Sequence, residues 1–266
     1  MPDRNKAIKK LDGFPNVLWI NLDRCTERRK YMEDHLSYWG IKDHHRISGI
    51  DGEEYEEYLK GTVPDQMNTG ELACVMSHLS ALKYFVEETD LDEVVIMEDD
   101  VDLSTALYWG FKWVDFMARV PYDWDVVQLA IICTGALHAR IHKRFVNDFS
   151  TACYMITRHH AEKLVKFHCR GDKYKIDQGV KPRAVADDLI YNSGNTYSVP
   201  IFLYKIALGS SIHPEHVDVF HKASHDGLVA FWKSSGADWT IDNFMDFDPY
   251  LGRITQPVNQ ERESET

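Results

Sequence analysis

The chain has 266 residues, of which 44% are hydrophobic and 27% charged, enough to bury the core of one large α/β domain or two small ones. Its formal net charge of −12 argues against binding to a phosphate backbone, so no nucleic-acid partner is expected. The longest apolar runs are far too short to cross a bilayer, and residues 1–16 lack the apolar stretch of a signal peptide. We therefore expect no membrane span and a cytoplasmic location.

Strand-like and helix-like segments alternate along the first part of the chain. The predicted elements are a strand at 16–22, a helix at 26–39 that ends at Gly40, a strand at 44–49 running into a turn, a surface helix or loop at 53–61, a helix from 69 to 86, and a buried strand at 94–97. Such alternation favours a mostly parallel sheet with helices on both faces.

The second part of the chain continues the pattern and then loosens. The predicted elements are a helix from Ser104, as its N-cap, to Val120, strands at 124–132 and 151–157, a helix at 158–169 and a strand at 196–204. The sequence has no internal repeat and no Pro-rich linker, which predicts one domain. The five cysteines are widely spaced and form no C-x-x-C pair, which predicts free, mostly buried thiols in a reducing compartment.

A group of acids follows the strand at 94–97 almost at once, in the segment DEVVIMEDDVDLS (92–104). Unpaired carboxylates this close repel one another, and burying a bare charge is costly. Open α/β sheets bind ligands outside the carboxyl ends of their strands, and a hard divalent cation that grips a phosphate would stabilise such a cluster. Glu98 and Asp100 alternate along the backbone, so both can face one side. The alternative is an acidic loop that opens the next helix.

Four segments, in order, resemble glycosyltransferase family 25, which includes bacterial lipooligosaccharide sugar transferases and collagen hydroxylysine galactosyltransferases. They are WINLDRCTERRKYMEDHL, RISGIDG, TGELACVMSHLSALKYFV and VVIMEDDVDLS. The resemblance covers residues 17–104 well. It continues more weakly through WDVVQLA, STACYMITRHHAEKLV and ADDLIY to YSVPIFLY.

The resemblance implies a GT-A-type domain, an open α/β fold that binds nucleotide sugars, over residues 1–252 with a lead-in at 1–14. Residues 253–266 are expected to be a disordered polar tail. The implied reaction moves a hexose from a UDP-sugar to a hydroxyl of a glycan or a hydroxylysine peptide, with Mn²⁺ or, alternatively, Mg²⁺, and with inversion at the anomeric carbon. The implied roles are lipopolysaccharide biosynthesis or collagen glycosylation. UDP-galactose, UDP-glucose and the oligomeric state are not distinguished.

The same resemblance implies a role for each acid of the cluster. Asp100 is the expected metal ligand, and Glu98 reaches the ribose, the sugar, a metal-bound water or the metal. Asp99 assists, and Asp102 is a solvated acid at a helix start. A histidine from the late cluster, His216 or His221, is expected to complete the metal shell, although histidines there also fit plain surface positions.

The expected nucleotide-sugar contacts come from the first strand tip, the following helix, the IDG turn and the long helix. They are Asn21, Leu22, Asp23, Arg24, Arg28, Arg29, Asp51, Gly52, Glu71 and His78. The three arginines compete for the diphosphate, which paired N–H donors suit. The alternatives are a solvated helix face for Arg28 and Arg29, an ordinary turn at Asp51-Gly52, dipole compensation by Glu71 and a structural His78.

The catalytic base is expected at Asp187 or Asp188, with Asp188 favoured. An N-cap position is the alternative for either residue. A rival reading is a phosphatase of the haloacid-dehalogenase type, with Asp100 as nucleophile, Asp102 as acid/base and Asp187-Asp188 holding Mg²⁺. A third reading is a relative that binds nucleotide sugar without transferring it.

Overall fold

The computed structural model describes residues 3–65, 67–133, 135–176, 183–209, 217, 221–245 and 252–254. Within these ranges the core is a seven-stranded sheet of order β2-β1-β3-β8-β5-β11-β7. Its strands are β1 (Val17–Leu22), β2 (His44–Gly49), β3 (Glu93–Glu98), β5 (Val126–Gln128), β7 (His142–Lys143), β8 (Cys153–Thr157) and β11 (Thr196–Ser198).

Five of these strands run in one direction. Strands β2, β1 and β3 pair in parallel, as do β5 and β11, whereas β8 is antiparallel to both β3 and β5, and β7 is antiparallel to β11. The predicted class, an open and mostly parallel α/β sheet, is confirmed. The reversal of β8 was not predicted, because residue periodicity carries no information on strand direction.

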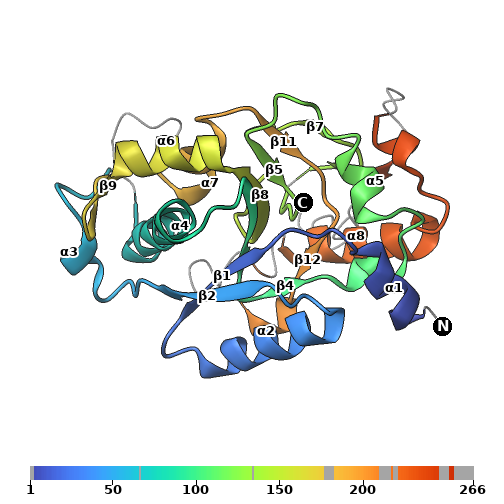
Figure 1. The fold of residues 1–266 in the computed structure, drawn as a ribbon, viewed down its shortest axis with the longest axis horizontal. Coiled ribbons are helices and arrows are strands. Elements are labelled where there is room, and N and C mark those ends of the chain that lie inside the picture. Colours follow the sequence, from blue (N-terminus) through green and yellow to red (C-terminus); the bar gives the residue numbers. More distant parts are fainter. Residues whose placement is uncertain are drawn as a thin grey trace, which may run out of the picture.

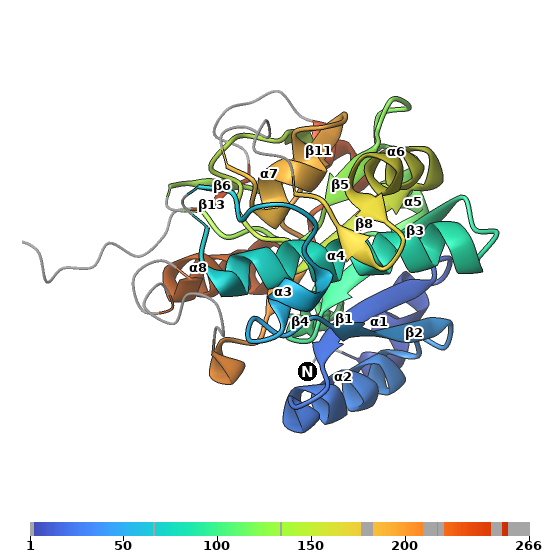
Figure 2. The ribbon, with the colours of Figure 1, turned by 90° about the vertical axis from the view of Figure 1, so that its left-hand side faces the viewer.

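Helices cover both faces of this sheet (Figure 1). They are α1 (Arg4–Lys10), α2 (Thr26–Trp39), α3 (Tyr55–Tyr58), α4 (Thr69–Glu88), α5 (Trp113–Met117), α6 (Arg158–His168), α7 (Ala186–Tyr191) and α8 (Lys222–Ser235), with 3₁₀ turns η1 (Ser104–Leu107), η2 (Ile206–Leu208) and η5 (Ile241–Met245). Figure 2 shows α4 and α2 on opposite sides of β1 and β2. Within the described residues, no helix combines the length and the hydropathy that a membrane span requires.

The core lies in two layers, one on each face of the sheet. In β1, Val17 and Trp19 pack into the layer that α2, η1, α5 and α8 cover, whereas Leu18 and Ile20 pack into the layer beneath α4, α6 and α7. The same alternation holds in β3 and β8. Burial on both faces explains why these strands are apolar almost throughout.

Three short strand pairs lie outside the central sheet: β4 (Val101–Asp102) with β12 (Leu203–Tyr204), β6 (Leu137–His138) with β13 (Arg253–Ile254), and β9 (Cys169–Arg170) with β10 (Lys173–Tyr174). The β4–β12 pair matters most for the site, because the Lys205 N–H donates to the Asp100 carbonyl at 2.6 Å. Strand β13 takes up the first two residues of the predicted tail, and residues 255–266 lie outside the described structure.

Two predicted elements are wrong. The helix expected from Ser104 to Val120 is broken into η1 and α5, and Ser104 is not its N-cap but the first residue of η1. Gly110 lies in the break, where the chain passes close to the Ala237 carbonyl. The strand expected over 196–204 is divided between β11 and β12, because Pro200 in the middle has no N–H for a ladder.

The five cysteines are free thiols, as predicted. Cys133 and Cys153 are buried, whereas Cys25, Cys74 and Cys169 are only half-buried. The expectation that most of them are buried therefore fails.

Candidate functional site

The carboxyl ends of β1, β2 and β3 meet at one edge of the sheet because these three strands are parallel. Ile20 of β1 pairs with Glu98 of β3, so Asn21 and Asp99 extend beyond the same edge. Strand β8 begins at this edge because it runs the other way, and the Glu98 N–H donates to the Ala152 carbonyl at 2.8 Å. The edge therefore gathers residues from four strands, as expected of a ligand site in an open α/β sheet.

A pocket of about 410 Å³ lies over this edge, between the ends of β1 and β2 and the start of α4. Its volume is in the range of small-molecule sites. It is lined by Ile20, Asn21, Leu22, Arg24, Cys25, Arg28, Gly49, Ile50, Asp51, Gly52, Glu53, Asn68, Thr69, Gly70, Ala73, Cys74, Ser77, His78, Glu98 and Asp99. We call it the strand-end pocket. Of the residues predicted to contact the nucleotide sugar, only Asp23, Arg29 and Glu71 are absent from its lining.

Arg28 is the cation at the centre of the acidic cluster. It lies in the first turn of α2, which follows directly on β1, and its side chain is 17% exposed. Its guanidinium bridges Asp99 and Asp100, with Nη2 2.8 Å from Asp100 Oδ2, and also donates to the Gly209 carbonyl at 3.0 Å. This one side chain therefore holds two of the acids together through charge-assisted hydrogen bonds.

The acids of the cluster differ in their ionisation. Burial raises the pKa of Asp100 to about 7; Arg28 opposes this rise, and Glu98 and Asp99 add to it. Burial also raises the pKa of Asp99. For Glu98, burial pushes the pKa upward, but the hydrogen bonds with His78 and Thr151 outweigh it and lower the pKa below its usual value. Glu98 is therefore the most readily ionised member of the cluster, and Asp100 titrates near neutral pH.

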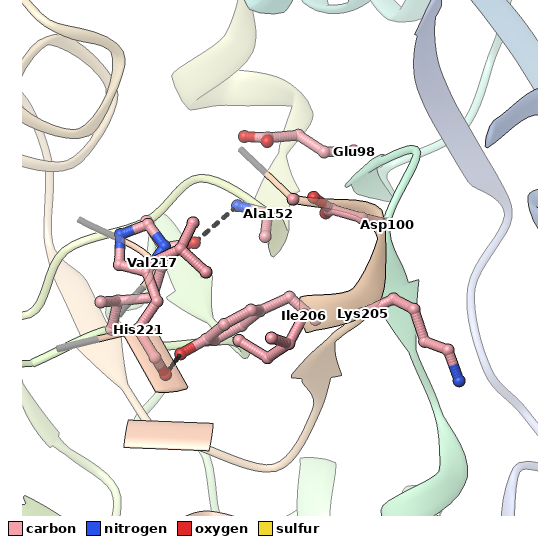
Figure 3. A pocket seen from close by; sticks show the side chains of 11 residues that line it. Glu98, Asp100, Ala152, Lys205, Ile206, Val217 and His221 are labelled. Carbon is pink, nitrogen blue, oxygen red and sulfur yellow. Dashed lines mark hydrogen bonds between the residues drawn. The ribbon is translucent and has the colours of Figure 1, made fainter. Parts of the chain in front are cut away.

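A second pocket of about 80 Å³ adjoins the first, and Glu98 lines both. Its other lining residues are Asp100, Ile132, Ser150, Ala152, Tyr204, Lys205, Ile206, Gly209, Val217 and His221. Figure 3 shows Glu98 and Asp100 near each other on one side of this inner pocket and His221 across from them. The expectation that Glu98 and Asp100 face the same side is confirmed, and His216 lies outside the described residues.

Asp100 has the free ligand atom that a cation site needs. Its Oδ1 is buried and has no hydrogen-bond partner among the described residues, whereas its Oδ2 is held by Arg28. A buried carboxylate oxygen without a partner is costly, and a hard cation such as Mn²⁺ or Mg²⁺ prefers such an oxygen. The residues present thus fit a divalent cation, with Asp100, Glu98 and His221 around the same pocket.

Ser150 forms part of the inner pocket wall with an unusual backbone. Its φ is +97°, which is strained for a residue other than glycine. Its N–H donates to Asp187 Oδ2 at 2.7 Å, and its carbonyl accepts from Gln128 Nε2 at 2.9 Å and from the Tyr191 hydroxyl at 3.0 Å. These contacts hold the strained turn in place and connect Asp187 to the pocket.

Asp187 and Asp188 open α7 and point to different partners. Asp188 is buried and accepts from the Arg183 N–H at 3.2 Å and from Asn192 Nδ2 at 3.1 Å, and Arg144 Nη2 lies 3.6 Å away. Asp187 instead reaches Ser150, and burial raises its pKa. Neither is the N-cap of α7, which is Val185. The geometry therefore places Asp187 nearer to the inner pocket than Asp188. The sequence analysis favoured Asp188 as the catalytic base.

His78 and Glu71 lie on one helix but have different surroundings. Glu71 closes a capping box with Asn68 and forms an ion pair with Arg183 at 2.7 Å. His78 is buried, with Nε2 3.3 Å from Glu98 Oε1 and Nδ1 3.1 Å from the Tyr154 hydroxyl. His78 is thus in the site, whereas the contacts of Glu71 stabilise the start of α4.

The outer rim holds the remaining predicted residues. Arg24 pairs with Asp51 at the mouth of the strand-end pocket. Asp23 is 72% exposed and pairs with Arg29 at 3.3 Å and with Arg46. Arg46 was not predicted as a site residue, although it stands in the RISGIDG segment.

Other residues of the site were missed because they reach it only through tertiary structure. They are Cys74, Ser150, Thr151, Tyr154, Tyr204 and Lys205. A sequence signal exists for Cys74, since it stands in the ELACVMSH segment ahead of His78.

The structure does not bring together the residues of the phosphatase reading. Asp102 Oδ1 accepts from the Ser104 N–H at 2.8 Å, and Asp102 lines a separate pocket of about 510 Å³. Asp100 lines the inner pocket instead. A nucleophile and its acid/base must face the same substrate, so this arrangement does not support that mechanism.

Residues 14–114 match the sequence profile of glycosyltransferase family 25, an LPS biosynthesis protein family. This match confirms, for these residues, the resemblance found in the sequence. No curated protein sequence matches the chain.

Several solved structures resemble the fold in part. A197 from STIV aligns with a TM-score of 0.35 at 11% identity over 71% of this chain and 84% of that one. The inositol-1-phosphate CTP transferase from T. maritima aligns with a TM-score of 0.36 at 13% identity over 77% of this chain and 95% of that one. HddC from Yersinia pseudotuberculosis aligns with a TM-score of 0.34 at 11% identity over 75% of this chain and 77% of that one.

Proposed function

We propose that the protein is a glycosyltransferase that moves a hexose, galactose or glucose, from a UDP-sugar to a hydroxyl acceptor, with inversion and with a divalent cation. One observation carries this proposal beyond the family match. Two adjoining pockets share Glu98, and at their junction Arg28 holds Asp99 and Asp100 while one buried oxygen of Asp100 lacks a partner among the described residues. Such a junction suits a donor whose diphosphate lies between a nucleoside and a sugar.

In this proposal the strand-end pocket binds the UDP part of the donor. The Asp51-Gly52 turn offers polar groups to the base and ribose, and Arg24 lies at the pocket mouth. Asn21 lines the pocket, but its buried amide already bonds to Asp99 and Arg46. Arg28 is the arginine nearest to the acids, so it is placed to meet the diphosphate with paired N–H donors. Its present partners, Asp99 and Asp100, keep it charged and in position.

The inner pocket would hold the cation and the reacting end of the donor. Asp100 supplies the free oxygen, and Glu98 and His221 lie within reach of the same space. The expected ion is Mn²⁺, with Mg²⁺ as the alternative, because both ions prefer carboxylate oxygens as ligands. When bound, the ion supplies positive charge to the leaving diphosphate.

The acceptor hydroxyl needs a carboxylate that removes its proton. We propose Asp187 for this role, because it contacts the strained Ser150 of the inner pocket and burial raises its pKa. A base with a raised pKa is better matched to the reaction near neutral pH. Asp188 is the less suitable of the pair, since its oxygens already have partners from Arg183 and Asn192.

The finer assignments rest on the resemblance and stay predictions. The acceptor is a glycan hydroxyl, as in lipopolysaccharide biosynthesis, or a hydroxylysine, as in collagen glycosylation. The single GT-A-type domain over residues 1–252 and the cytoplasmic location are likewise proposals.

The test is UDP release by the purified protein with a panel of UDP-sugars, in Mn²⁺ and in EDTA, with and without hydroxylysine and simple sugars. We expect metal-dependent turnover of one donor and a loss of at least about a hundredfold in Asp100→Asn, since the ion stabilises the leaving group. Asp102→Asn is the matched control, because Asp102 lines another pocket.

Three outcomes would decide between the readings. Turnover that survives EDTA and Asp100→Asn contradicts the metal assignment. Mn²⁺-dependent UDP binding without release of UDP from any donor favours a relative that binds without transferring. Absence of UDP binding contradicts the glycosyltransferase proposal itself.

A further inference from the structure

Three potential metal ligands meet on the floor of the strand-end pocket. Cys74 Sγ, a ring nitrogen of His78 and a carboxylate oxygen of Glu98 all lie within 4.8 Å of one another. Cys74 and His78 are four residues apart on α4, so they lie on the same face of that helix, and Glu98 ends β3 opposite them. The placement of α4 over the sheet thus brings a thiol, an imidazole and a carboxylate together.

The spacing suits a small ion with short bonds. His78 Nε2 lies 3.3 Å from Glu98 Oε1. A tetrahedral zinc ion with bonds of about 2.0–2.3 Å separates its ligands by roughly 3.3–3.8 Å. The nitrogen and the oxygen are therefore already at a ligand-to-ligand distance, and the Cys74 side chain needs only a small adjustment.

Groups around the three ligands are arranged as they are around metal sites. His78 Nδ1 lies 3.1 Å from the Tyr154 hydroxyl, and the Thr151 hydroxyl donates to Glu98 Oε1 at 2.8 Å. A ligating histidine commonly bonds through its second ring nitrogen to a fixed partner, which sets the tautomer. The Tyr154 hydroxyl both donates and accepts, so it serves His78 whether Nδ1 or Nε2 carries the proton.

The ligand types select the kind of ion. A thiolate ligand favours Zn²⁺ and related ions, whereas Mn²⁺ and Mg²⁺ are bound mainly through oxygen ligands. Asp100, with its free carboxylate oxygen in the inner pocket, belongs to the second kind of site. Glu98 lines both pockets, so Cys74 and Asp100 are the residues that distinguish the two sites.

We propose that Cys74, His78 and Glu98 form a binding site for a thiophilic divalent cation of the Zn²⁺ class, with three protein ligands and an open position toward the strand-end pocket. Three protein ligands with a free fourth position are typical of zinc sites that bind an exogenous ligand. The Cys74 thiol loses its proton when the ion binds, and that proton passes to solvent. The site does not depend on the glycosyltransferase proposal.

The test is titration of the metal-stripped full-length protein with Co²⁺, which replaces Zn²⁺ and reports on its ligands. A sulfur ligand gives a thiolate-to-cobalt charge-transfer band in the near ultraviolet. We expect this band to saturate at about one equivalent and to be reversed by Zn²⁺. Absence of the band in the wild-type protein would overturn the proposal without recourse to any variant.

Variants identify the ligands. Cys74→Ser should abolish the band, and Tyr154→Phe should weaken Zn²⁺ binding by about 10–100-fold, the usual effect of losing the partner of a ligating histidine. Cys25→Ser and Cys169→Ser should keep the band, since Cys25 and Cys169 stand outside the three-residue cluster. A band that survives Cys74→Ser, or that is lost in Cys25→Ser or Cys169→Ser, contradicts the assignment.

Two further measurements distinguish a metal site from a purely structural contact between α4 and β3. Circular dichroism of each variant shows whether it is folded, and Asp100→Asn should keep the thiolate-to-cobalt band of the wild type, since Asp100 is not one of the three ligands. If the three residues serve only to lock α4 to β3 by hydrogen bonds, Tyr154→Phe lowers the thermal stability but leaves the Zn²⁺ affinity unchanged. That result would overturn the proposal, whereas failure of UDP binding with the band intact would count against the glycosyltransferase proposal alone.

Discussion

Arg28 and Asp100 form an ion pair at the junction of two pockets, with Nη2 of the arginine 2.8 Å from Oδ2 of the aspartate and both side chains 17% exposed. The other oxygen of Asp100 is buried without a partner among the described residues. The arginine therefore satisfies only half of this carboxylate. The pair therefore leaves one buried carboxylate oxygen available to a cation.

The first prediction concerns the geometry of Arg28. Arg28→Lys keeps one positive charge but cannot bridge Asp99 and Asp100 while also donating to Gly209. Removing one partner of a buried pair costs about 3–5 kcal/mol of unfolding free energy. Because the lysine keeps the charge, we expect Arg28→Lys to lower the free energy of unfolding by roughly 1–3 kcal/mol and to bind UDP at least about tenfold more weakly. Urea unfolding and calorimetric titration with UDP measure the two effects.

The matched control is Arg24→Lys. Arg24 is 63% exposed and pairs with Asp51, and exposed pairs contribute about 0–1 kcal/mol. If both variants unfold at the urea concentration of the wild type, Arg28 does not hold the cluster as described.

Much of the fold followed from sequence because local pattern and tertiary structure agree in the N-terminal part. The strand at β1, the helix from Thr26 to Trp39 and the long helix α4 lie where the apolar periodicity placed them. The position of the acids after β3 also followed from the sequence, since residues that follow a parallel strand lie at the sheet edge where open α/β sheets bind ligands. The shared orientation of Glu98 and Asp100 required only the two-residue period of a strand.

What the sequence left open depends on contacts between distant segments. Arg28, rather than Arg24 or Arg29, contacts the acids, which lie about seventy positions later in the chain. Thr151 reaches Glu98 only because β8 runs antiparallel to β3. No periodicity in residues 104–120 reveals that the chain must turn at Gly110.

The second prediction separates the two acids of α7. Asp187→Asn should lower kcat by about 10²–10⁴-fold, the usual contribution of a general base, with little change in UDP affinity. Asp188→Asn should act mainly on stability, because Asp188 lies between Arg144, Arg183 and Asn192. Steady-state kinetics and thermal melting of both variants make the comparison. If a well-folded Asp188→Asn variant loses more kcat than Asp187→Asn, the catalytic base is Asp188 and not Asp187.

The third prediction concerns the pH dependence of stability. His35 Nε2 accepts from the Leu103 N–H at 2.9 Å, which requires a neutral ring, and burial lowers the pKa of His35 to about 4, although Asp102 at 3.8 Å opposes this. A histidine with a lowered folded-state pKa stabilises the fold above its unfolded pKa, and that contribution is lost as pH falls from about 6.5 to about 4. At about 1.4 kcal/mol per unit, the loss is on the order of 3 kcal/mol.

Urea unfolding at pH 7 and at pH 4.5 measures this loss, and His35→Gln is the matched variant. A glutamine oxygen also accepts a hydrogen bond but does not titrate. Carboxylates titrate in the same interval in both proteins, so the difference between the two proteins isolates His35. Equal losses of stability in both would show that His35 does not titrate as described.

The last prediction tests how the C-terminal segment packs. A Cβ at Gly110 would clash with the Ala237 carbonyl oxygen and would lie 3.0 Å from that of Trp239. Backbone atoms cannot move aside as a flexible side chain does, so Gly110→Ala should destabilise the protein by about 1–3 kcal/mol. Gly135→Ala is the control, because among the described residues a Cβ there meets only Cys133 Sγ at 3.8 Å, and we expect it to be neutral or to stabilise by up to about 1 kcal/mol. If Gly110→Ala melts at the wild-type temperature, the segment after α8 does not pack against the break between η1 and α5 as described.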